Sequence, residues 1–242
     1  PRTYAVPRAF TPPVVDGRID DAAWSAAPWT ADFVDIEGPS RPHPRHRTRV
    51  KMLWDSVYLY VAAELEEPHV WGTLTERDAV IYHDDDFEVF IDPDGDTRAY
   101  YELEVNALGT VWDLFLTRPY RDGGRAIDAW DIRGLVRGVH VDGTVNDPSD
   151  TDRGWSVELA LPWSVLEEAA PRRGPPRPGD TWRMNFSRVD WEVRVVDGRY
   201  VKETDPETGR PLPEHNWVWT PQWEINMHAP EHWGRVTFVG AE

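Results

Sequence analysis

Residues 81–115, IYHDDDFEVFIDPDGDTRAYYELEVNALGTVWDLF, contain the pattern that decides the fold. Within 87–92 and again within 100–107, apolar side chains occupy every second position, which is the period of a β-strand. The residues between these runs include DPDGD at 92–96, where Pro and Gly are placed to reverse the chain. The stretch therefore predicts a β-hairpin with one apolar face.

The opposite face of this hairpin carries acids and aromatic rings. Glu88 on the first strand and Glu104 on the second fall on that face if the strands pair as the turn suggests. Neighbouring carboxylates repel unless water, a cation or the hydroxyls of a ligand separate them. We therefore expect a polar, aromatic-edged surface suited to a polyhydroxylated ligand.

Outward from the hairpin, short alternating segments separated by turn residues continue along the chain. They predict a single antiparallel β-sandwich of about 10–12 strands, jelly-roll or immunoglobulin-like, formed by residues 1–242 with an extended lead-in at 1–13. We expect one short helix at 163–169 and a helical turn around Trp24. The other expected strands are 48–52, 57–64, 110–116, 135–140, 155–161, 181–189, 192–196, 200–203 and 235–239, and we expect an aromatic loop at 217–234.

Composition narrows the class of partner. The net charge of -17 argues against nucleic acid and anionic membranes. The 14 tryptophans suggest that some serve as exposed stacking platforms. No cysteine is present, so there is no disulfide framework and no thiol nucleophile. No stretch is long enough for a membrane span. The chain opens at Pro1 without a visible signal peptide, so the sequence neither shows nor excludes export. We expect a secreted or periplasmic location, which the family resemblance given below implies.

Five motifs, in order, resemble the family 9 carbohydrate-binding modules, and especially the stand-alone branch of that family within a wider group of ligand-binding β-sandwiches. The motifs are VDGRID at 15–20 with Trp24, LWD at 53–55 with YLYV at 58–61, DDFEVFID at 85–92, GWSVE at 154–158 with LPW at 161–163, and PEHWG at 230–234. The resemblance implies a non-catalytic sandwich that binds the ends of sugar chains, takes part in polysaccharide degradation or uptake beside glycoside hydrolases, and often holds structural calcium.

The resemblance also implies where a ligand would sit. In related modules two tryptophans clamp one sugar ring; aligned by the motifs, these positions fall on Tyr82 and near Met227. A polar contact of the family maps onto Glu88. A basic residue of the family falls on Glu104, a reversal of charge that argues for a different ligand or for a cation between the two acids.

Taken together, rings that can stack on a pyranose and polar groups that can bind its hydroxyls predict the site. The predicted ligand contacts are Tyr82, Glu88, Glu104, Trp112, Trp219, Trp223, Asn226 and His228. The run Asp84-Asp85-Asp86 suggests a calcium site, because calcium prefers several hard oxygen ligands. The resemblance implies a role for Glu67 as well, since it aligns with an acidic residue of a metal loop in the family, and the predicted ligands are Glu67, Asp84 and Asp85.

Two other functions remain open at this point. Paired carboxylates such as Glu88 and Glu104 would serve a glycoside-acting enzyme if they flanked one cleft. A haem-binding redox sandwich would use Met227 or His228 with a distant partner such as Met52 or Met184. Met227 and His228 would point to opposite faces if they lay on a strand.

Overall fold

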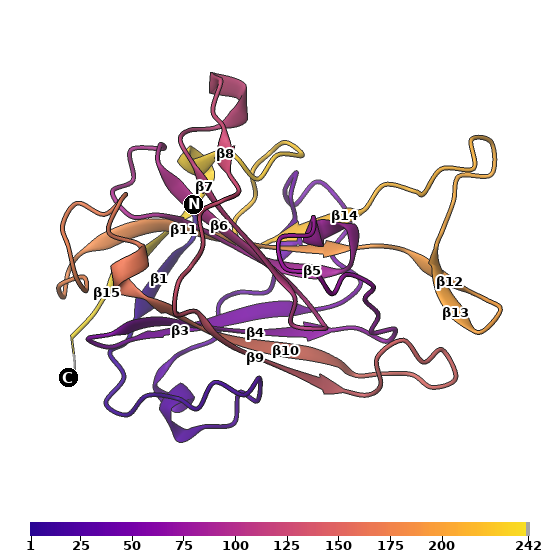
Figure 1. Cartoon of the computed structure of the whole chain (residues 1–242), viewed down its shortest axis with the longest axis horizontal. Coiled ribbons are helices and arrows are strands. Elements are labelled where there is room, and N and C mark those ends of the chain that lie inside the picture. Colours follow the sequence, from indigo (N-terminus) through magenta and orange to yellow (C-terminus); the bar gives the residue numbers. More distant parts are fainter. Residues whose placement is uncertain (241–242) are drawn as a thin grey trace.

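The computed structural model describes residues 1–240, so the last two residues of the expected domain lie outside the described part. Two β-sheets pack face to face, with loops and a projecting hairpin around them (Figure 1). The strands are β1 (Thr3–Val6), β2 (Val34–Asp35), β3 (Thr48–Trp54), β4 (Tyr58–Glu66), β5 (Asp86–Asp92), β6 (Tyr100–Asn106), β7 (Val111–Leu116), β8 (Ala126–Ile127), β9 (Val136–Asp142), β10 (Gly154–Pro162), β11 (Thr181–Asp190), β12 (Val193–Val196), β13 (Arg199–Lys202), β14 (His215–Val218) and β15 (Gly234–Phe238).

The larger sheet forms the upper layer in Figure 1 and has the order β1-β15-β11-β5-β6-β7-β8, with β14 and β2 attached beside β11. The predicted hairpin is confirmed as β5 and β6, which pair antiparallel with Glu88 opposite Glu104. All neighbours in this sheet are antiparallel except β1, which runs parallel to β15. The extended lead-in therefore ends in an edge strand.

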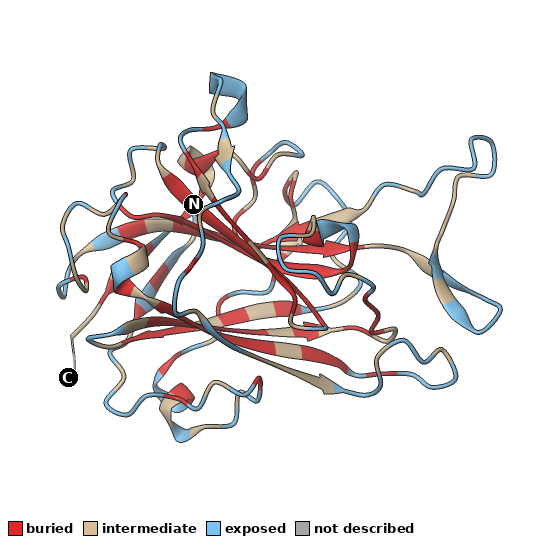
Figure 2. Cartoon of the chain, in the orientation of Figure 1, coloured by how far each residue is buried: buried red, intermediate tan, exposed pale blue. Residues whose placement is uncertain are grey.

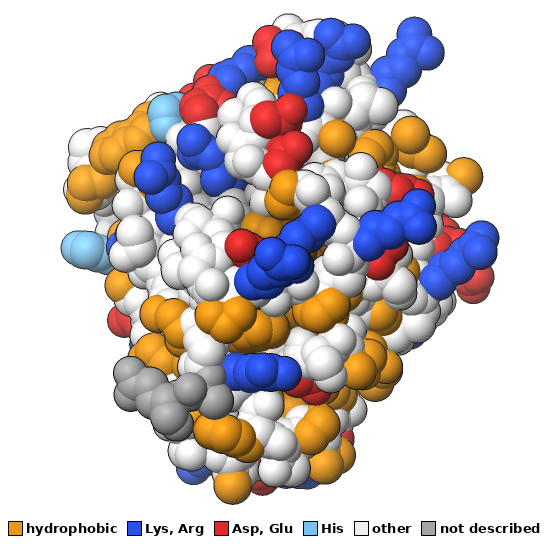
Figure 3. Space-filling model, turned by 90° about the vertical axis from the view of Figure 1, so that its left-hand side faces the viewer, with side chains coloured by type: hydrophobic (Ala, Val, Ile, Leu, Met, Phe, Trp, Pro, Cys, Tyr) orange, Lys and Arg blue, Asp and Glu red, His pale blue; other side chains and the backbone are white. Residues whose placement is uncertain are grey.

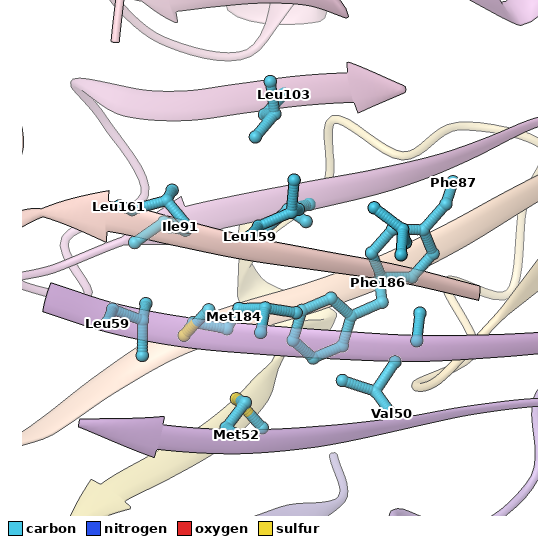
Figure 4. Packing of buried hydrophobic residues seen from close by; sticks show 14 of the residues in the cluster. Val50, Met52, Leu59, Phe87, Ile91, Leu103, Leu159, Leu161, Met184 and Phe186 are labelled. Carbon is cyan, nitrogen blue, oxygen red and sulfur yellow. The ribbon is translucent and has the colours of Figure 1, made fainter. Parts of the chain in front are cut away.

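The smaller sheet has the order β3-β4-β10-β9 and forms the lower layer. Its apolar side chains interdigitate with those of the larger sheet, as Val50, Leu59 and Leu159 do with Phe87 and Phe186 in Figure 4. The rings of Phe87 and Phe186 stack with centroids 5.9 Å apart. This core confirms the all-β sandwich that the alternation predicts.

β5 and β6 are buried along their whole length, and therefore on both faces (Figure 2). Their inner residues belong to the core between the sheets. Their outer residues Phe90 and Tyr100 belong to a second cluster, which also contains Leu114, Leu116 and Val218 from neighbouring strands and Ile36, Met227 and Trp233 from loops. The outer face of the larger sheet is thus partly roofed, and the roof creates the walls of the site described below.

Two predictions about local structure were wrong. The predicted helix at 163–169 is only a 3-10 turn, η4 (Trp163–Val165), and residues 1–240 contain no α-helix. Seven residues ahead of Pro171 are too few to support an isolated helix, and the Trp163 indole instead donates a hydrogen bond to the main-chain oxygen of Asp55 at 2.9 Å. The other 3-10 turns are η1 (Ala22–Ala26), η2 (Ile81–His83), η3 (Tyr120–Asp122) and η5 (Pro230–His232).

The predicted aromatic loop at 217–234 begins as a strand. Residues of β14 pair with β11, with Trp217 opposite Arg188. Alternation then continues past the end of the strand, so that Trp217 and Trp219 enter the main core while Val218 faces the outer cluster. Because the main chain here completes the sheet, these tryptophans are structural.

The VDGRID motif is explained by a buried carboxylate on β10. Glu158 accepts hydrogen bonds from the Trp24 indole at 2.6 Å and from the main-chain N–H of Gly17 at 2.8 Å. Gly17 has φ +92°, and a Cβ on it would lie 2.4 Å from the main chain of His140. The motif therefore attaches the N-terminal segment to the outer face of the smaller sheet.

None of the helical turns in residues 1–240 is long and apolar enough to span a membrane. The hairpin β12–β13 extends away from the body at the right of Figure 1.

Candidate functional site

The floor of the candidate site is a row of paired residues across four strands. Ser187 of β11 lies opposite Glu88 of β5, Glu88 opposite Glu104 of β6, and Glu104 opposite Trp112 of β7. Side chains of directly paired residues project from the same face of a sheet. Main-chain pairing therefore brings two carboxylates and an indole together on the outer face, next to Glu102 on the following row.

Loops build walls around this floor and enclose a hollow of about 500 Å³. This volume lies in the range of pockets that hold small ligands. The hollow is lined by Ile36, Tyr82, Glu88, Phe90, Glu102, Glu104, Trp112, Leu114, Tyr120, Val189, Glu214, Asn216, Ile225, Asn226, Met227 and His228.

Acids dominate the charge of the hollow. Burial raises the pKa of Glu88 to about 7, and burial together with the neighbouring Glu88 raises the pKa of Glu102 and of Glu104 well above the ordinary value. Among the described residues no Lys or Arg lines the hollow. Basic side chains lie elsewhere, as on the end of the molecule in Figure 3, where they are spread among acidic and apolar groups.

One histidine belongs to the site. His228 lies beside the floor with Nδ1 2.9 Å from the Tyr100 hydroxyl and Nε2 3.9 Å from a Glu102 oxygen, beyond hydrogen-bond distance. Burial lowers the pKa of His228 to about 4, so the ring is neutral at pH 7 and does not balance the acids. The edge of its ring meets Tyr120, with centroids 4.6 Å apart.

Two aromatic rings form one wall. The ring centroids of Tyr82 and Trp112 are 6.4 Å apart and their planes are inclined by 33°, so the rings lie side by side rather than facing each other across a gap. Tyr82 is held by its main chain, whose N–H donates to Glu104 at 3.0 Å and whose carbonyl accepts from the Trp191 indole at 2.9 Å. The wall therefore presents two adjoining rings, and the main chain of Tyr82 is anchored to Glu104 and Trp191.

The structure brings most of the predicted ligand contacts together. Six of the eight line the hollow: Tyr82, Glu88, Glu104, Trp112, Asn226 and His228. Tyr82 and Met227, the two positions that align with the sugar clamp of related modules, both line this hollow. Because Met227 and His228 fall in a loop and not on a strand, both contact the hollow instead of pointing to opposite faces.

Two predicted contacts lie elsewhere. Trp219 is buried in the core, where a Cβ on Gly234 would lie 2.2 Å from its ring. Trp223 is 60% exposed, packs against Gly38 and does not line the hollow. Trp219 and Trp223 are close in sequence to Asn226 and His228, which line the hollow, but their side chains point elsewhere.

Ten lining residues were not among the predicted contacts: Ile36, Phe90, Glu102, Leu114, Tyr120, Val189, Glu214, Asn216, Ile225 and Met227. Glu102 shares the outer face of β6 with Glu104, so strand alternation could have identified it. Tyr120 and Ile225 come from irregular segments that meet in space through Arg121, which pairs with Glu224 at 3.2 Å and also with Glu231. No local sequence pattern predicts that these two segments come together.

The three residues of the predicted calcium site already have protein partners. Glu67 pairs with the buried Arg188 at 2.5 Å. Asp84 accepts hydrogen bonds from Thr73, Leu74 and Asn106, and Asp85 accepts from Trp71 and Trp191. These donors use the oxygens that an ion would need, so the three residues do not fit a shared calcium site.

The methionines proposed as haem ligands are also separated from the hollow. Met52 and Met184 lie in the core between the sheets (Figure 4), whereas Met227 and His228 lie on the outer side of the larger sheet. The structure therefore does not bring the proposed axial pair together.

A second, larger hollow of about 820 Å³ lies at the ends of β4, β9 and β10. Several of its charged residues pair with one another: Arg47 contacts Glu64 at 3.2 Å and Glu66 at 3.0 Å, and Arg153 approaches Asp142 at 3.7 Å. Its one tryptophan, Trp155, is buried in the core. Paired charges and the lack of a ring surface make it a weaker candidate than the acid-floored hollow.

A two-sheet sandwich with rings and acids around a hollow on one sheet is a ligand-binding β-sandwich. The chain belongs to the family described as carbohydrate family 9 binding domain-like, whose model matches residues 15–241.

Known proteins agree with this membership. The chain is 26% identical over 154 residues to Exoglucanase XynX of Acetivibrio thermocellus, a match that covers 64% of this chain and 12% of that protein. It is 33% identical over 90 residues to Endo-1,4-beta-xylanase C of Paenibacillus barcinonensis, covering 37% of this chain and 8% of that protein. The chain thus corresponds to a small part of these relatives.

Solved structures show the same fold. A carbohydrate binding module family 9 from Caldicellulosiruptor kristjanssonii, in complex with cellotriose, superposes with a TM-score of 0.61 at 17% identity, covering 100% of this chain and 95% of that one. A protein from Bacteroides uniformis superposes with a TM-score of 0.69 at 15% identity, covering 98% and 99%. At these identities the comparison establishes the sandwich and nothing about the ligand of this chain.

Proposed function

We propose that this protein binds the end of a carbohydrate chain in the acid-floored hollow and does not alter it chemically. The observation that carries the proposal is the convergence of two adjoining rings, Tyr82 and Trp112, with three carboxylates on one floor. A pyranose offers both surfaces that such a site needs, because its C–H face packs on aromatic rings and its hydroxyls donate hydrogen bonds to acids.

Unused acceptors support a hydroxyl-rich ligand. Glu102 is 5% exposed, yet its Oε2 atom has no hydrogen-bond partner in the described chain. Buried polar atoms are ordinarily paired, so a donor from outside the protein accounts for this oxygen. Asn216 and Asn226 add amide groups that can both donate and accept.

The arrangement of the acids favours binding over hydrolysis. A glycosidase places its two carboxylates on either side of the bond to be cleaved. Here Glu88 and Glu104 project from neighbouring strands in a single row, and an oxygen of Glu88 lies within 4.8 Å of an oxygen of Glu104. Both contact a ligand from below, so neither is placed to act from the opposite side.

A glycan array followed by calorimetry tests this function. We expect binding of at least one class of oligosaccharide, and we expect Trp112→Ala and Glu102→Gln to weaken it tenfold or more. Trp29→Ala and Glu168→Gln are matched controls: Trp29 packs against Arg49 with 4.1 Å from the guanidinium to the ring, Glu168 is exposed, and neither lines the hollow. Unchanged binding in both site variants, or no binding to any glycan, would contradict the proposal.

The proposal extends to where and with what the protein works. Its relatives include an exoglucanase and xylanases, which supports action outside the cytoplasm beside enzymes that degrade polysaccharides. Fractionation of the source cells checks the location. Incubation of the purified protein with the bound oligosaccharide checks the absence of chemistry, since we expect no new reducing ends.

A further inference from the structure

At the edge of the floor, three carboxylates lie close together. Oxygens of Asp86, Glu88 and Glu104 all lie within 4.8 Å of one another. Calcium binds its oxygen ligands at about 2.3–2.6 Å, so one ion can contact all three oxygens at once. The three residues are 0%, 5% and 2% exposed, respectively, which removes them from the bulk water that would otherwise screen their repulsion.

Asp86 points to a ligand independently of the cluster. Its Oδ1 accepts a hydrogen bond from the main-chain N–H of Val189 at 3.2 Å, but its Oδ2 is buried without a partner in the described chain. Asp86 does not line the hollow, so a sugar resting on the floor does not explain this oxygen. An ion beside the floor, between Asp86 and the two glutamates, does.

Comparison with the other acidic clusters of the described residues separates this one from them. Arg188 and Arg45 pair with the cluster of His46, Glu67 and Asp190. Arg77 pairs with Asp78, Asp113 and Asp131. In the cluster of Asp92, Asp94 and Asp96, the N–H groups of Gly95 and Thr97 occupy both oxygens of Asp92 in a turn. Asp86, Glu88 and Glu104 have no Lys or Arg partner among residues 1–240.

We propose that Asp86, Glu88 and Glu104 bind one divalent cation of the calcium type, and that the ion completes its coordination with hydroxyls of the ligand in the hollow. Hard carboxylate oxygens suit calcium, which takes six to eight ligands and so keeps positions free on the side that faces the hollow. The first half of the proposal stands on the cluster and on the unpaired oxygen of Asp86, and the second half rests on the proposed function.

Calorimetric titration of chelator-treated protein with CaCl₂, together with terbium luminescence sensitised by the nearby Trp112, tests the ion site. Asp86→Asn is the sharpest variant, because Asn keeps an acceptor for the Val189 N–H and the residue does not touch the hollow. We expect the wild-type protein to bind calcium, and Asp86→Asn and Glu104→Gln each to lose one equivalent or to bind it at least tenfold more weakly. Asp94→Asn, in the exposed turn, is the control and retains the terbium signal.

Circular dichroism and the melting temperature in chelator establish that each variant is folded. Absence of calcium binding by the wild-type protein, or an unchanged stoichiometry and affinity in both site variants, overturns the ion site. The glycan experiment then separates the two proposals. Equal sugar affinity in chelator and in calcium overturns ion-assisted binding and leaves the proposed function standing. Calcium binding by a protein that binds no glycan overturns the proposed function and leaves the ion site standing.

Discussion

Glu88 of β5 and Glu104 of β6 are directly opposite each other, an oxygen of one lies within 4.8 Å of an oxygen of the other, and neither forms an ion pair with a Lys or Arg among residues 1–240. Like charges opposite each other on neighbouring strands destabilise a sheet. The pair is tolerated because burial keeps these carboxyls protonated up to higher pH than usual, and its properties lead to the first prediction.

The stability of the ligand-free, chelator-treated protein should fall as pH rises from about 4.5 to about 7. Burial raises the pKa of Glu88, Glu67 and Asp92 to about 7, so over this range the folded chain holds protons that the unfolded chain has released. For one carboxyl the shift from 4.5 to about 7 corresponds to on the order of 3 kcal/mol. His228 acts in the opposite sense between pH 4 and 6.5, but it is one group against several.

Melting temperatures in chelator at pH 5.5 and pH 8 measure this effect, and we expect the lower value at pH 8. Glu88→Gln should reduce the difference, because Gln does not ionise. If calcium binds as proposed, it should raise the melting temperature at pH 8 more than at pH 5.5. A melting temperature that rises steadily with pH would contradict the prediction.

Arg121 should strengthen ligand binding without touching the ligand. It joins two wall segments, since it lies next to Tyr120 and pairs with Glu224, the neighbour of Ile225. Exposed ion pairs contribute about 0.2–1 kcal/mol, so Arg121→Ala should weaken binding by up to about fivefold. The difference from wild type should shrink in 0.5 M salt, which screens exposed charges. The exposed Arg118→Ala is the control, and equal affinities of both variants at low salt would rule out this role.

Gly17→Ala should destabilise the fold far more than Gly123→Ala. Both glycines have positive φ, +92° and +77°, so both substitutions strain the main chain. A Cβ on Gly17 would lie 2.4 Å from the main chain of Val139 and His140, whereas nothing lies within 4 Å of one on Gly123. We expect about 1–2 kcal/mol for Gly123→Ala, the cost of a Cβ in the left-handed region, and at least twice that for Gly17→Ala, measured by urea unfolding. Similar losses would show that the close approach carries no energetic weight.

Arg188→Met should be among the most damaging single changes. Arg188 is 1% exposed and donates to Glu67 and Asp190 at 2.5 and 2.8 Å, and its loss leaves Glu67 buried beside Asp190. Removing one member of a buried ion pair costs about 3–5 kcal/mol. Arg153→Met is the comparison, because the Arg153 side chain is 86% exposed and its change should fall within about 0.5 kcal/mol. Chemical denaturation measures both, and a small loss in Arg188→Met would refute the prediction.

The floor of the site could be predicted from sequence because strand alternation is a local rule. The period of two placed Glu88 and Glu104 on one face, and the turn at 92–96 set the register that makes them opposite. The same rule could have added Glu102. It also implies that Trp217 and Trp219 share a face, but the sequence did not reveal that this face points into the core.

The walls could not be predicted in the same way. Tyr120 and Ile225 are separated by more than a hundred residues and meet only because β6, β7 and β14 carry their loops to one side of the sheet. The carboxylates at Glu67, Asp84 and Asp85 looked like ion ligands because their donors, such as Arg188 and Trp191, lie far along the chain. Partners distant in sequence decide whether an acid is free or already satisfied.

Because strands form the floor of the hollow and loops form its walls, the two parts of the site can change independently. The row from Ser187 to Trp112 is fixed by main-chain pairing, whereas the segments that carry Tyr120 and Ile225 lie outside that ladder. Grafting those two segments from a relative would alter specificity while the acidic platform keeps its geometry. Diversification of such modules can proceed at the rim, one exchanged loop at a time, without a new fold.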